Sequence, residues 1–375
     1  MSKELICLNG EWEFMPVYGV KACVDLPKEI HFEQEKIRVP SSWRYVTPEG
    51  AAYCNGDFGI VDDFQPFNLF EYPIEWSKAD TGVYRKTFTI PDIICGERIF
   101  LCFNGIMQQS RIYLNNNIVA EWDEAFLPLK IDITKHIKAE RCENELMVIC
   151  TTFDEVQMKS GRTKSLGLIG SWFGFLGRGI WQDVYIERTS PTYIVDALIK
   201  TSVRNKSIQV EVEVENKQDQ AQEVTIIMDI LEKSEIVPTF KPQQLKLEGN
   251  SIKSIKIEEP WEDPQLWSFE APFLYRMQIV LHSNGSEIDR KTISFGYREI
   301  WTENDQFILN GIRVNLRGDS WHFQGANQQT KEYASNWFKM CKEKGLNFVR
   351  LHAEPHPEYY LEAADEVGIL IIDET

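Results

Sequence analysis

Hydrophobic and polar residues alternate with a period of two along the first half of the chain, which is the spacing of half-buried β-strands. TGVYRKTFTIP (81–91) alternates up to a closing proline, and NELMVICTTF (144–153) is a continuous apolar run of strand length. SRIYLNNNIVAEW (110–122) predicts a hairpin, because its three consecutive asparagines tolerate the positive φ of a tight turn. GRGIWQDVYIER (177–188) is a glycine-rich approach to another strand. With almost no helical period, these runs predict a β-sandwich of the jelly-roll type over residues 1–189.

A second all-β pattern follows that region. SIQVEVEVENK (207–217) alternates strictly, with Ile and Val on one face and Gln and Glu on the other. Such a strand buries one face and exposes the other to water. Further runs of this kind follow at the spacing of a small antiparallel sandwich, which has about seven strands in about 100 residues. We therefore expect an immunoglobulin-like β-sandwich over residues 190–298, without an intersheet disulfide because no Cys lies between 151 and 340.

The spacing of hydrophobic residues changes after Trp301. FILNGIRVNLRG (307–318) predicts a short strand pair around an Asn-Gly turn, and TKEYASNWFKMCKEKG (330–345) predicts a helix that ends at its glycine. On this helix, one stripe contains Tyr333, Trp337, Met340 and Cys341.

Strand, helix and strand then follow each other to the last residues. LNFVRLH (346–352) and ILIIDE (369–374) are apolar runs of strand length, and PEYYLEAADEVG (357–368) between them has the Pro and Gly that favour helix ends. Apolar strands linked by a helix are typical of parallel strands buried on both faces. Residues 299–375 therefore begin an α/β domain.

Composition narrows the classes of partner. Apolar residues make up 43% and charged residues 26% of the chain, and the formal net charge is −17. An acidic surface repels phosphates and anionic lipids, so we expect neither a nucleic acid nor a membrane as partner. Neutral ligands stay open, and some of the 11 Trp could form platforms for sugar rings. Without a signal peptide or an apolar span, the sequence predicts a cytoplasmic protein, or a periplasmic one if a signal was removed.

The eight cysteines and six histidines do not indicate a metal site. No CxxC pair occurs, so we expect reduced, buried thiols. HAEPH (352–356) has two histidines four positions apart, but its proline is incompatible with the helix that a zinc site of the HExxH kind requires. The sequence also lacks a glycine-rich phosphate loop and a GxSxG motif. We therefore predict no metal in this chain.

Polar side chains gather where the predicted parallel strands end. The polar residues after the three strands are the run from Arg317 to His322, then Arg350, His352 and Glu354, and last Asp373 and Glu374. Because reacting groups collect at the carboxyl ends of parallel strands, these residues could bind sugar hydroxyls. They could equally form a ring of ion pairs, and the residues alone leave both interpretations open.

Taken together, the motifs resemble glycoside hydrolase family 2. The resemblance rests on DTGVYRKTFTIP, SRIYLNNNIVAEWDEAFLPLKIDIT, GRGIWQDVYIE, FGYREI, FILNGIRVNLRGDSWH and GLNFVRLHAEPHPEYYLEAADEVGILIIDE, in that order. It implies a mainly β, multidomain chain: a jelly-roll sugar-binding domain, an immunoglobulin-like sandwich, and the first part of a (β/α)8 TIM barrel.

The resemblance also implies a substrate-binding set. It consists of His322 after the first barrel strand, Arg350 and His352 after the second, and Asp373 and Glu374 after the third. The family often has Arg-x-Ser-His after the second strand, whereas here the histidine stands one position earlier. Such a shift turns a side chain to the other face of a strand, so we expect a different role for this histidine.

The implied activity is that of a retaining exo-β-glycosidase, most closely a β-galactosidase. Retention requires two catalytic carboxylates, which the family takes from later barrel strands, so we expect none in this chain and an inactive fragment ending at Thr375. A β-glucuronidase, a β-mannosidase or a non-catalytic carbohydrate-binding module are the alternatives. No cofactor is evident, although the family resemblance allows Mg²⁺ or Na⁺ in the full-length enzyme, a carbohydrate substrate and a homo-oligomer.

Overall fold

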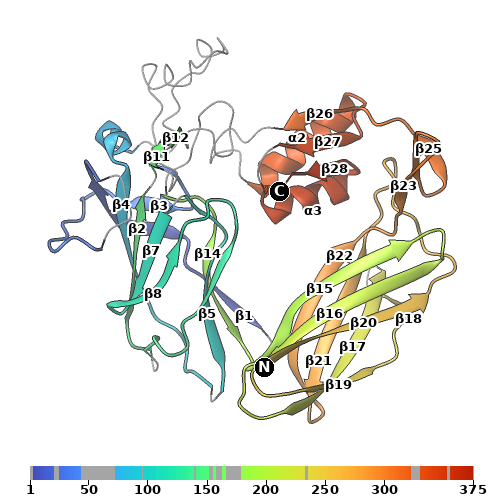
Figure 1. Cartoon of the computed structure of the whole chain (residues 1–375), viewed down its shortest axis with the longest axis horizontal. Coiled ribbons are helices and arrows are strands. Elements are labelled where there is room, and N and C mark those ends of the chain that lie inside the picture. The colour runs from blue at the N-terminus through green and yellow to red at the C-terminus, as the bar shows by residue number, and fades with distance from the viewer. Residues whose placement is uncertain are drawn as a thin grey trace.

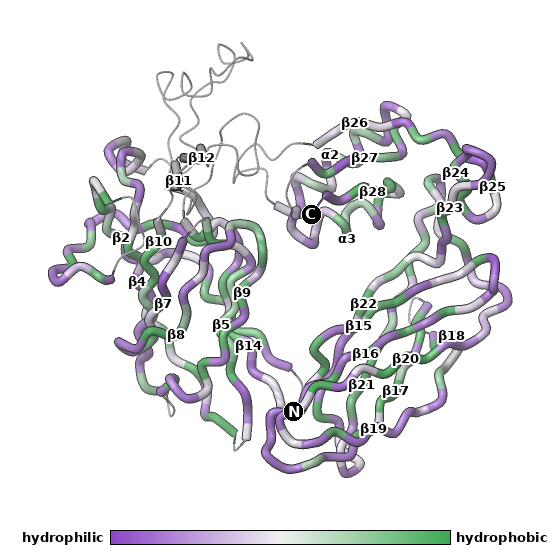
Figure 2. Tube along the Cα trace, in the orientation of Figure 1, coloured by the Kyte–Doolittle hydropathy of each residue, from purple (hydrophilic) through white to green (hydrophobic). Residues whose placement is uncertain are grey.

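The chain forms two β-sandwiches and a smaller α/β unit (Figure 1). The computed structural model describes residues 3–20, 25–43, 72–94, 96–107, 109–138, 141–151, 155–157, 163–165, 179–232, 235–321, 330–352 and 355–374. The amino terminus lies near the junction of the two sandwiches, and the carboxyl terminus lies in the α/β unit. Stretches of hydrophobic residues lie along the strands of both sandwiches (Figure 2), as their period-two patterns predict.

The first sandwich consists of two antiparallel sheets. One sheet has the order β1 (Glu4–Cys7), β14 (Val184–Thr189), β5 (Arg98–Phe103) and β9 (Leu129–Asp132). The other has the order β3 (Ile37–Val39), β2 (Gly10–Val17), β4 (Thr81–Phe88), β10 (Asn144–Thr151), β7 (Gln109–Leu114) and β8 (Asn117–Trp122). The short elements are the 3₁₀ helix η3 (Ile74–Lys78) and the strands β6 (Ile106–Met107), β11 (Glu155–Gln157), β12 (Thr163–Ser165) and β13 (Gly179–Ile180).

Large aromatic residues fill the space between these two sheets. Trp12, Phe14, Trp43 and Tyr84 are each at most 1% exposed, and the Phe14 ring lies 5.0 Å from that of Tyr84. The predicted hairpin is confirmed, because β7 and β8 pair around Asn115 at φ 50° and the next asparagine at φ 65°. Asparagine occupies this left-handed region more readily than most residues, which explains the choice of side chain.

The second sandwich packs a three-stranded sheet on a five-stranded one. The first sheet consists of β15 (Thr192–Ser202), β16 (Ser207–Asn216) and β20 (Ser251–Pro260), and the second of β18 (Glu235–Thr239), β17 (Gln222–Glu232), β21 (Tyr275–Ser283) and β22 (Ser286–Phe295), with β19 (Gln243–Leu247) also paired to β17. On β16 the apolar face is buried as predicted, since Ile208, Val210, Val212 and Val214 are at most 1% exposed.

A small antiparallel sheet connects this sandwich to the α/β unit. Its strands are β23 (Ile300–Glu303), β24 (Gln306–Leu309) and β25 (Ile312–Val314). The predicted Asn310-Gly311 turn joins β24 and β25, with φ values of 53° and 84°. The α/β unit consists of β26 (Gly318–Trp321), α2 (Lys331–Glu343), β27 (Phe348–Leu351), α3 (Glu358–Val367) and β28 (Leu370–Asp373). Its three strands are parallel.

Two expectations about the α/β unit are wrong. The buried residues of α2 are Ala334, Phe338 and Cys341, whereas Met340 of the predicted stripe is 50% exposed. The predicted stripe is therefore wrong at Met340, whereas Cys341 is buried and Tyr333 and Trp337 pack partly buried against the core. The strands are also not buried on both faces within the described residues, because Ile372 is 49% exposed. Both helices lie over the face that carries Val349, and the opposite face has no helix among the described residues.

Helix α3 contacts both sandwiches. The Gln182 side-chain amide of the first sandwich donates to the Tyr359 hydroxyl of α3 over 3.2 Å. From the side of the second sandwich, the Trp267 indole N–H donates to the Asp365 carbonyl over 2.8 Å, and Arg298 donates to the Asp365 carboxylate over 2.7 Å. The helix that precedes β28 is thus held by both sandwiches.

At the level of fold class, the prediction of a mainly β chain with β-sandwich domains is confirmed. The domain boundaries 1–189, 190–298 and 299–375 stay a prediction. Among the described cysteines, Cys102, Cys150 and Cys341 are buried free thiols, and burial raises the pKa of Cys102 to about 12, whereas Cys7 and Cys142 are exposed. No helix in the described ranges has the length and apolar character needed to cross a membrane.

Candidate functional site

A charged pair lies where the three parallel strands end. Arg350 in β27 donates from Nε to Glu374 Oε1 over 2.7 Å, and its Nη2 lies 2.6 Å from the same oxygen. Its Nη1 donates to the Ser320 hydroxyl of β26 over 3.3 Å. One guanidinium thus joins residues from all three strand ends.

Strand alternation decides which face this pair occupies. Val349 and Leu351 are fully buried beneath the helices, so Arg350 between them projects from the uncovered face. Arg350 and Glu374 side chains are 38% and 34% exposed. A guanidinium has five N–H donors, and two of those of Arg350 are not used in the contacts above. The pair can therefore still donate hydrogen bonds to a ligand.

The other predicted site residues are placed differently. Asp373 aligns with Leu351 in the parallel register, which puts it on the helix-covered side, away from Glu374. Partial burial raises the pKa of the Asp373 carboxyl group. His352 directly follows β27, and its backbone N–H donates to the Trp321 carbonyl over 2.9 Å, so it keeps the alternation that puts it on the Arg350 face. His322 lies outside the described residues.

Sequence reasoning alone did not single out two features of this region. Ser320 was only one of six residues in a polar run, and its contact with Arg350 depends on strand register. The contact between Gln182 and Tyr359 joins residues 177 positions apart, and no local pattern encodes it. Burial raises the pKa of Tyr359, so its hydroxyl stays protonated, and its oxygen accepts the hydrogen bond from the Gln182 amide.

The described residues do not form a metal centre. They contain no group of three or more His, Cys, Asp or Glu side chains that could hold an ion. Within HAEPH, His356 is buried and contacts the ring of Tyr360, with 5.2 Å between the ring centres. The Mg²⁺ or Na⁺ of the full-length protein stays a prediction.

Sequence comparison identifies the two sandwiches. The model of glycosyl hydrolases family 2, sugar binding domain, matches residues 5–161, and that of glycosyl hydrolases family 2 matches residues 192–298. The chain belongs to glycosyl hydrolases family 2. The predicted membership, as the N-terminal portion of a family 2 protein, is confirmed.

Individual family 2 relatives align with nearly the whole chain. A β-galactosidase of Priestia megaterium is 24% identical over 98% of this chain and 35% of its own length. A putative β-glucuronidase of Formosa agariphila is 24% identical over 98% of this chain and 32% of its own length. Among solved structures, the β-glucuronidase of Bacteroides uniformis matches with a TM-score of 0.74 at 20% identity, covering 98% of this chain and 42% of that one. The chain thus spans about a third of the length of the curated relatives it matches.

Proposed function

We propose that the full-length protein is a retaining exo-β-glycosidase, most closely a β-galactosidase, and that this chain forms the near wall of its active site. The Arg350–Glu374 pair carries the proposal, because it stands at the ends of parallel strands with unused N–H donors. Sugar hydroxyls accept such donors, and guanidinium and carboxylate groups together can bind adjacent hydroxyls. The carbohydrate substrate agrees with the family and with the names of its relatives.

The α/β unit is the start of a (β/α)8 barrel in this proposal. Two surfaces support that interpretation. The uncovered face of the three-stranded sheet carries Ile372 and the half-buried Phe348, which further inward-facing side chains would cover in a closed barrel. The second surface is on α2, on the flank away from α3.

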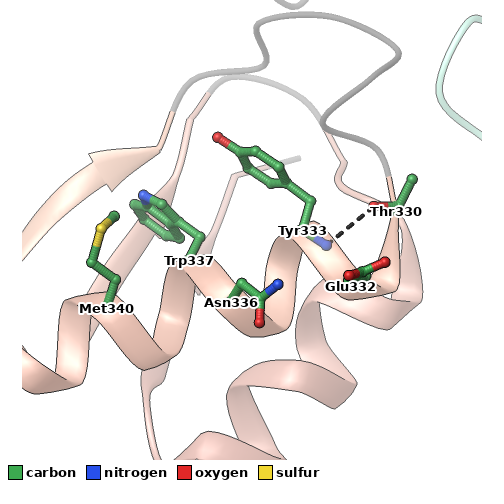
Figure 3. Close-up of a pocket in the computed structure, with 6 residues that line it drawn as sticks. All are labelled: Thr330, Glu332, Tyr333, Asn336, Trp337 and Met340. Carbon is green, nitrogen blue, oxygen red and sulfur yellow. Dashed lines mark hydrogen bonds between the residues drawn. The ribbon is translucent and has the colours of Figure 1, made fainter.

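That flank of α2 carries a shallow pocket of about 440 Å³ (Figure 3), lined by Thr330, Glu332, Tyr333, Asn336, Trp337 and Met340. Toward α3 the helix instead presents Lys331, paired with Glu362 over 2.9 Å. In a closed barrel each helix has a neighbour on both sides. A helix from later in the full-length protein is therefore the occupant expected on this flank.

The same proposal assigns a jelly-roll fold to the first sandwich and an immunoglobulin-like fold to the second. The two catalytic glutamates would then come from later barrel strands, about 5 Å apart in a retaining enzyme. The residues His322, His352 and Asp373 stay predicted substrate contacts. The absence of nucleic-acid and membrane partners stays a prediction, and a homo-oligomer stays a predicted possibility for the full-length protein.

A β-glucuronidase is the second candidate, because a putative β-glucuronidase aligns with 98% of this chain and a β-glucuronidase shares its fold. Charge separates the two candidates. A uronic acid substrate needs a cation for its carboxylate, and Arg350 is already paired with Glu374. A further cation, from loops later in the full-length protein, would be needed to favour the glucuronide.

A panel of nitrophenyl β-glycosides on the full-length protein tests this proposal. We expect the galactoside to have the highest kcat/KM and Arg350→Ala to lower kcat/KM by about tenfold or more, the effect of losing a hydrogen bond to a charged group. The 375-residue chain alone should show no turnover. The proposal is overturned if no glycoside in the panel is hydrolysed, or if the native reading frame ends at Thr375, in which case a carbohydrate-binding module is the better interpretation. Inactivation by EDTA would test the metal requirement.

A further inference from the structure

The turn between β21 and β22 consists of an asparagine followed by a glycine. Asn284 and Gly285 have φ values of 51° and 77°, and they join the paired residues Ser283 and Ser286. Positive φ at both central residues is the usual geometry of a two-residue hairpin turn, and Asn-Gly suits it. The same dipeptide is chemically reactive, because glycine has no side chain that keeps its backbone nitrogen away from the amide group of the asparagine.

The two central residues of this turn are both exposed to solvent. Among the residues that the structure describes, none forms a hydrogen bond with the Asn284 side-chain amide. A Cβ added to Gly285 would meet nothing within 4 Å, so the space around this glycine is open. Exposed turns with few contacts open locally at a small cost in free energy. The amide carbon of Asn284 and the nitrogen of Gly285 can therefore approach each other without unfolding the sandwich.

A second turn with the same dipeptide lies between β24 and β25. Its residues Asn310 and Gly311 have φ values of 53° and 84°, close to those of the first turn. Here the side-chain amide is held at both ends. Asn310 Oδ1 accepts a hydrogen bond from the Glu299 N–H over 2.9 Å, and Nδ2 donates to the Trp267 carbonyl over 2.8 Å. The two turns thus share their central residues and their positive φ values, and they differ in whether the amide is fixed.

The other Asn-Gly pairs that the structure describes are constrained as well. The side chain of Asn9 forms two hydrogen bonds, of 2.8 Å and 2.9 Å. In the pair at positions 104 and 105 the glycine is buried, and a Cβ at Gly105 would lie 2.7 Å from the Trp181 ring. A further pair, Asn55-Gly56, lies outside the described residues. Within the described part of the chain, the turn at Asn284 therefore combines an exposed glycine with an amide that is not held.

We propose that Asn284 is a site of spontaneous deamidation. The backbone nitrogen of Gly285 attacks Asn284 Cγ and forms a Cγ–N bond, while the bond from Cγ to Nδ2 breaks and ammonia leaves with the proton of the glycine N–H. Water then opens the resulting cyclic imide at either of its carbonyl groups, which gives aspartate or isoaspartate. Water is the other reactant, and no oxidant or cofactor takes part. The modification does not depend on the proposed glycosidase activity.

The products change both the charge and the geometry of the turn. Each event replaces a neutral amide with a carboxylate, three residues before Glu287, whose own carboxylate lies 2.6 Å from Arg290 Nη2. Isoaspartate also inserts a carbon atom into the backbone, and the register between Ser283 and Ser286 depends on the length of the turn. More acidic forms of the chain and a loss of hydrogen-exchange protection at this end of β21 and β22 should therefore accumulate together.

Incubation of the folded chain in mildly alkaline buffer, followed by peptide mapping with mass spectrometry, tests the proposal. We expect Asn284 to convert at least about tenfold faster than Asn310, the factor that roughly 1.4 kcal/mol gives, since two hydrogen bonds must break before Asn310 can react. The variant Asn284→Gly has no amide to lose and keeps a residue that tolerates positive φ, so it should fold and release no ammonia from this turn.

The same chain unfolded in urea is the matched control. Both dipeptides are then free of tertiary contacts, so Asn284 and Asn310 should convert at similar rates. The proposal is overturned if Asn284 stays unmodified in the folded chain, or if Asn310 converts equally fast there. It is also overturned if the difference between the two asparagines persists in urea, which would place its cause in the flanking residues rather than in the fold.

Discussion

Replacing Glu97 with leucine should destabilise the first sandwich by about 3–5 kcal/mol, the usual cost of breaking a buried ion pair. Glu97 and Arg188 form two parallel hydrogen bonds, Nε to Oε1 over 2.7 Å and Nη2 to Oε2 over 2.9 Å. Their side chains are 0% and 5% exposed. Without Glu97, the anionic partner left to the buried guanidinium among the described residues is Glu4, 2.8 Å away and 52% exposed.

Removing both charges together should cost far less. In the double variant Glu97→Leu, Arg188→Met, no unpaired charge stays buried, and apolar replacements of buried pairs are often neutral or stabilising. The half-exposed Glu4 can be hydrated once its partner is gone. The double-mutant cycle should therefore give a coupling energy of about 3 kcal/mol, at the upper end of measured pairwise couplings.

Native-state hydrogen exchange is the appropriate assay, because a chain with several cores need not unfold in one step. Exchange on peptides from β5 and β14 measures the free energy of opening of the sheet that contains the pair. The exposed pair Lys331–Glu362, with side chains 52% and 50% exposed, is the control and should give a coupling below about 1 kcal/mol. If Glu97→Leu costs less than about 1 kcal/mol, or the double variant costs as much as the single one, the reasoning from burial is refuted.

Three further outcomes follow from the structure. Burial raises the pKa of Asp289. The contribution of this carboxyl group to the free energy of unfolding is therefore complete below its unfolded-state pKa and is lost as pH rises through its folded-state pKa. Asp289→Asn should consequently flatten the dependence of the unfolding free energy on pH above about 4. Gly318→Ala would place a Cβ 2.3 Å from the Phe348 carbonyl oxygen, so hydrogen exchange should show loss of protection in β26 and β27, and unchanged protection would contradict the contact. Ile372→Lys should reduce self-association in light scattering, because lysine on an open apolar strand opposes pairing with another chain, and an already monomeric parent chain would contradict this expectation.

Local sequence patterns were sufficient to predict most strands and helices of this chain. Each pattern follows from a requirement of the residues themselves, such as a buried strand face or a positive φ angle. The alternation on β16 reports one buried face, and Asn115 and Gly368 report positive φ values, which the structure has at 50° and 93°. The buried stripe of α2 could not be predicted in this way. Ala334 and Phe338 are buried, whereas the neighbouring Tyr333 and Trp337 are only partly buried against the same core, and the position of the sheet decides this difference.

The sequence predicted which residue types lie at the candidate site, but not which side chains they contact. These contacts distinguish the two interpretations that the sequence left open, sugar binding and a structural ring of ion pairs. If the strand-end residues served only as an ion-pair ring, their pairing would have to stabilise the fold. Arg350 and Glu374 are 38% and 34% exposed, and pairs of that exposure contribute at most about 1 kcal/mol. Covering this face with further barrel strands would bury the pair, and a buried guanidinium needs partners for every N–H. A sugar hydroxyl at the two unused N–H groups would satisfy that need, so closure of the proposed barrel would favour binding over a purely structural role.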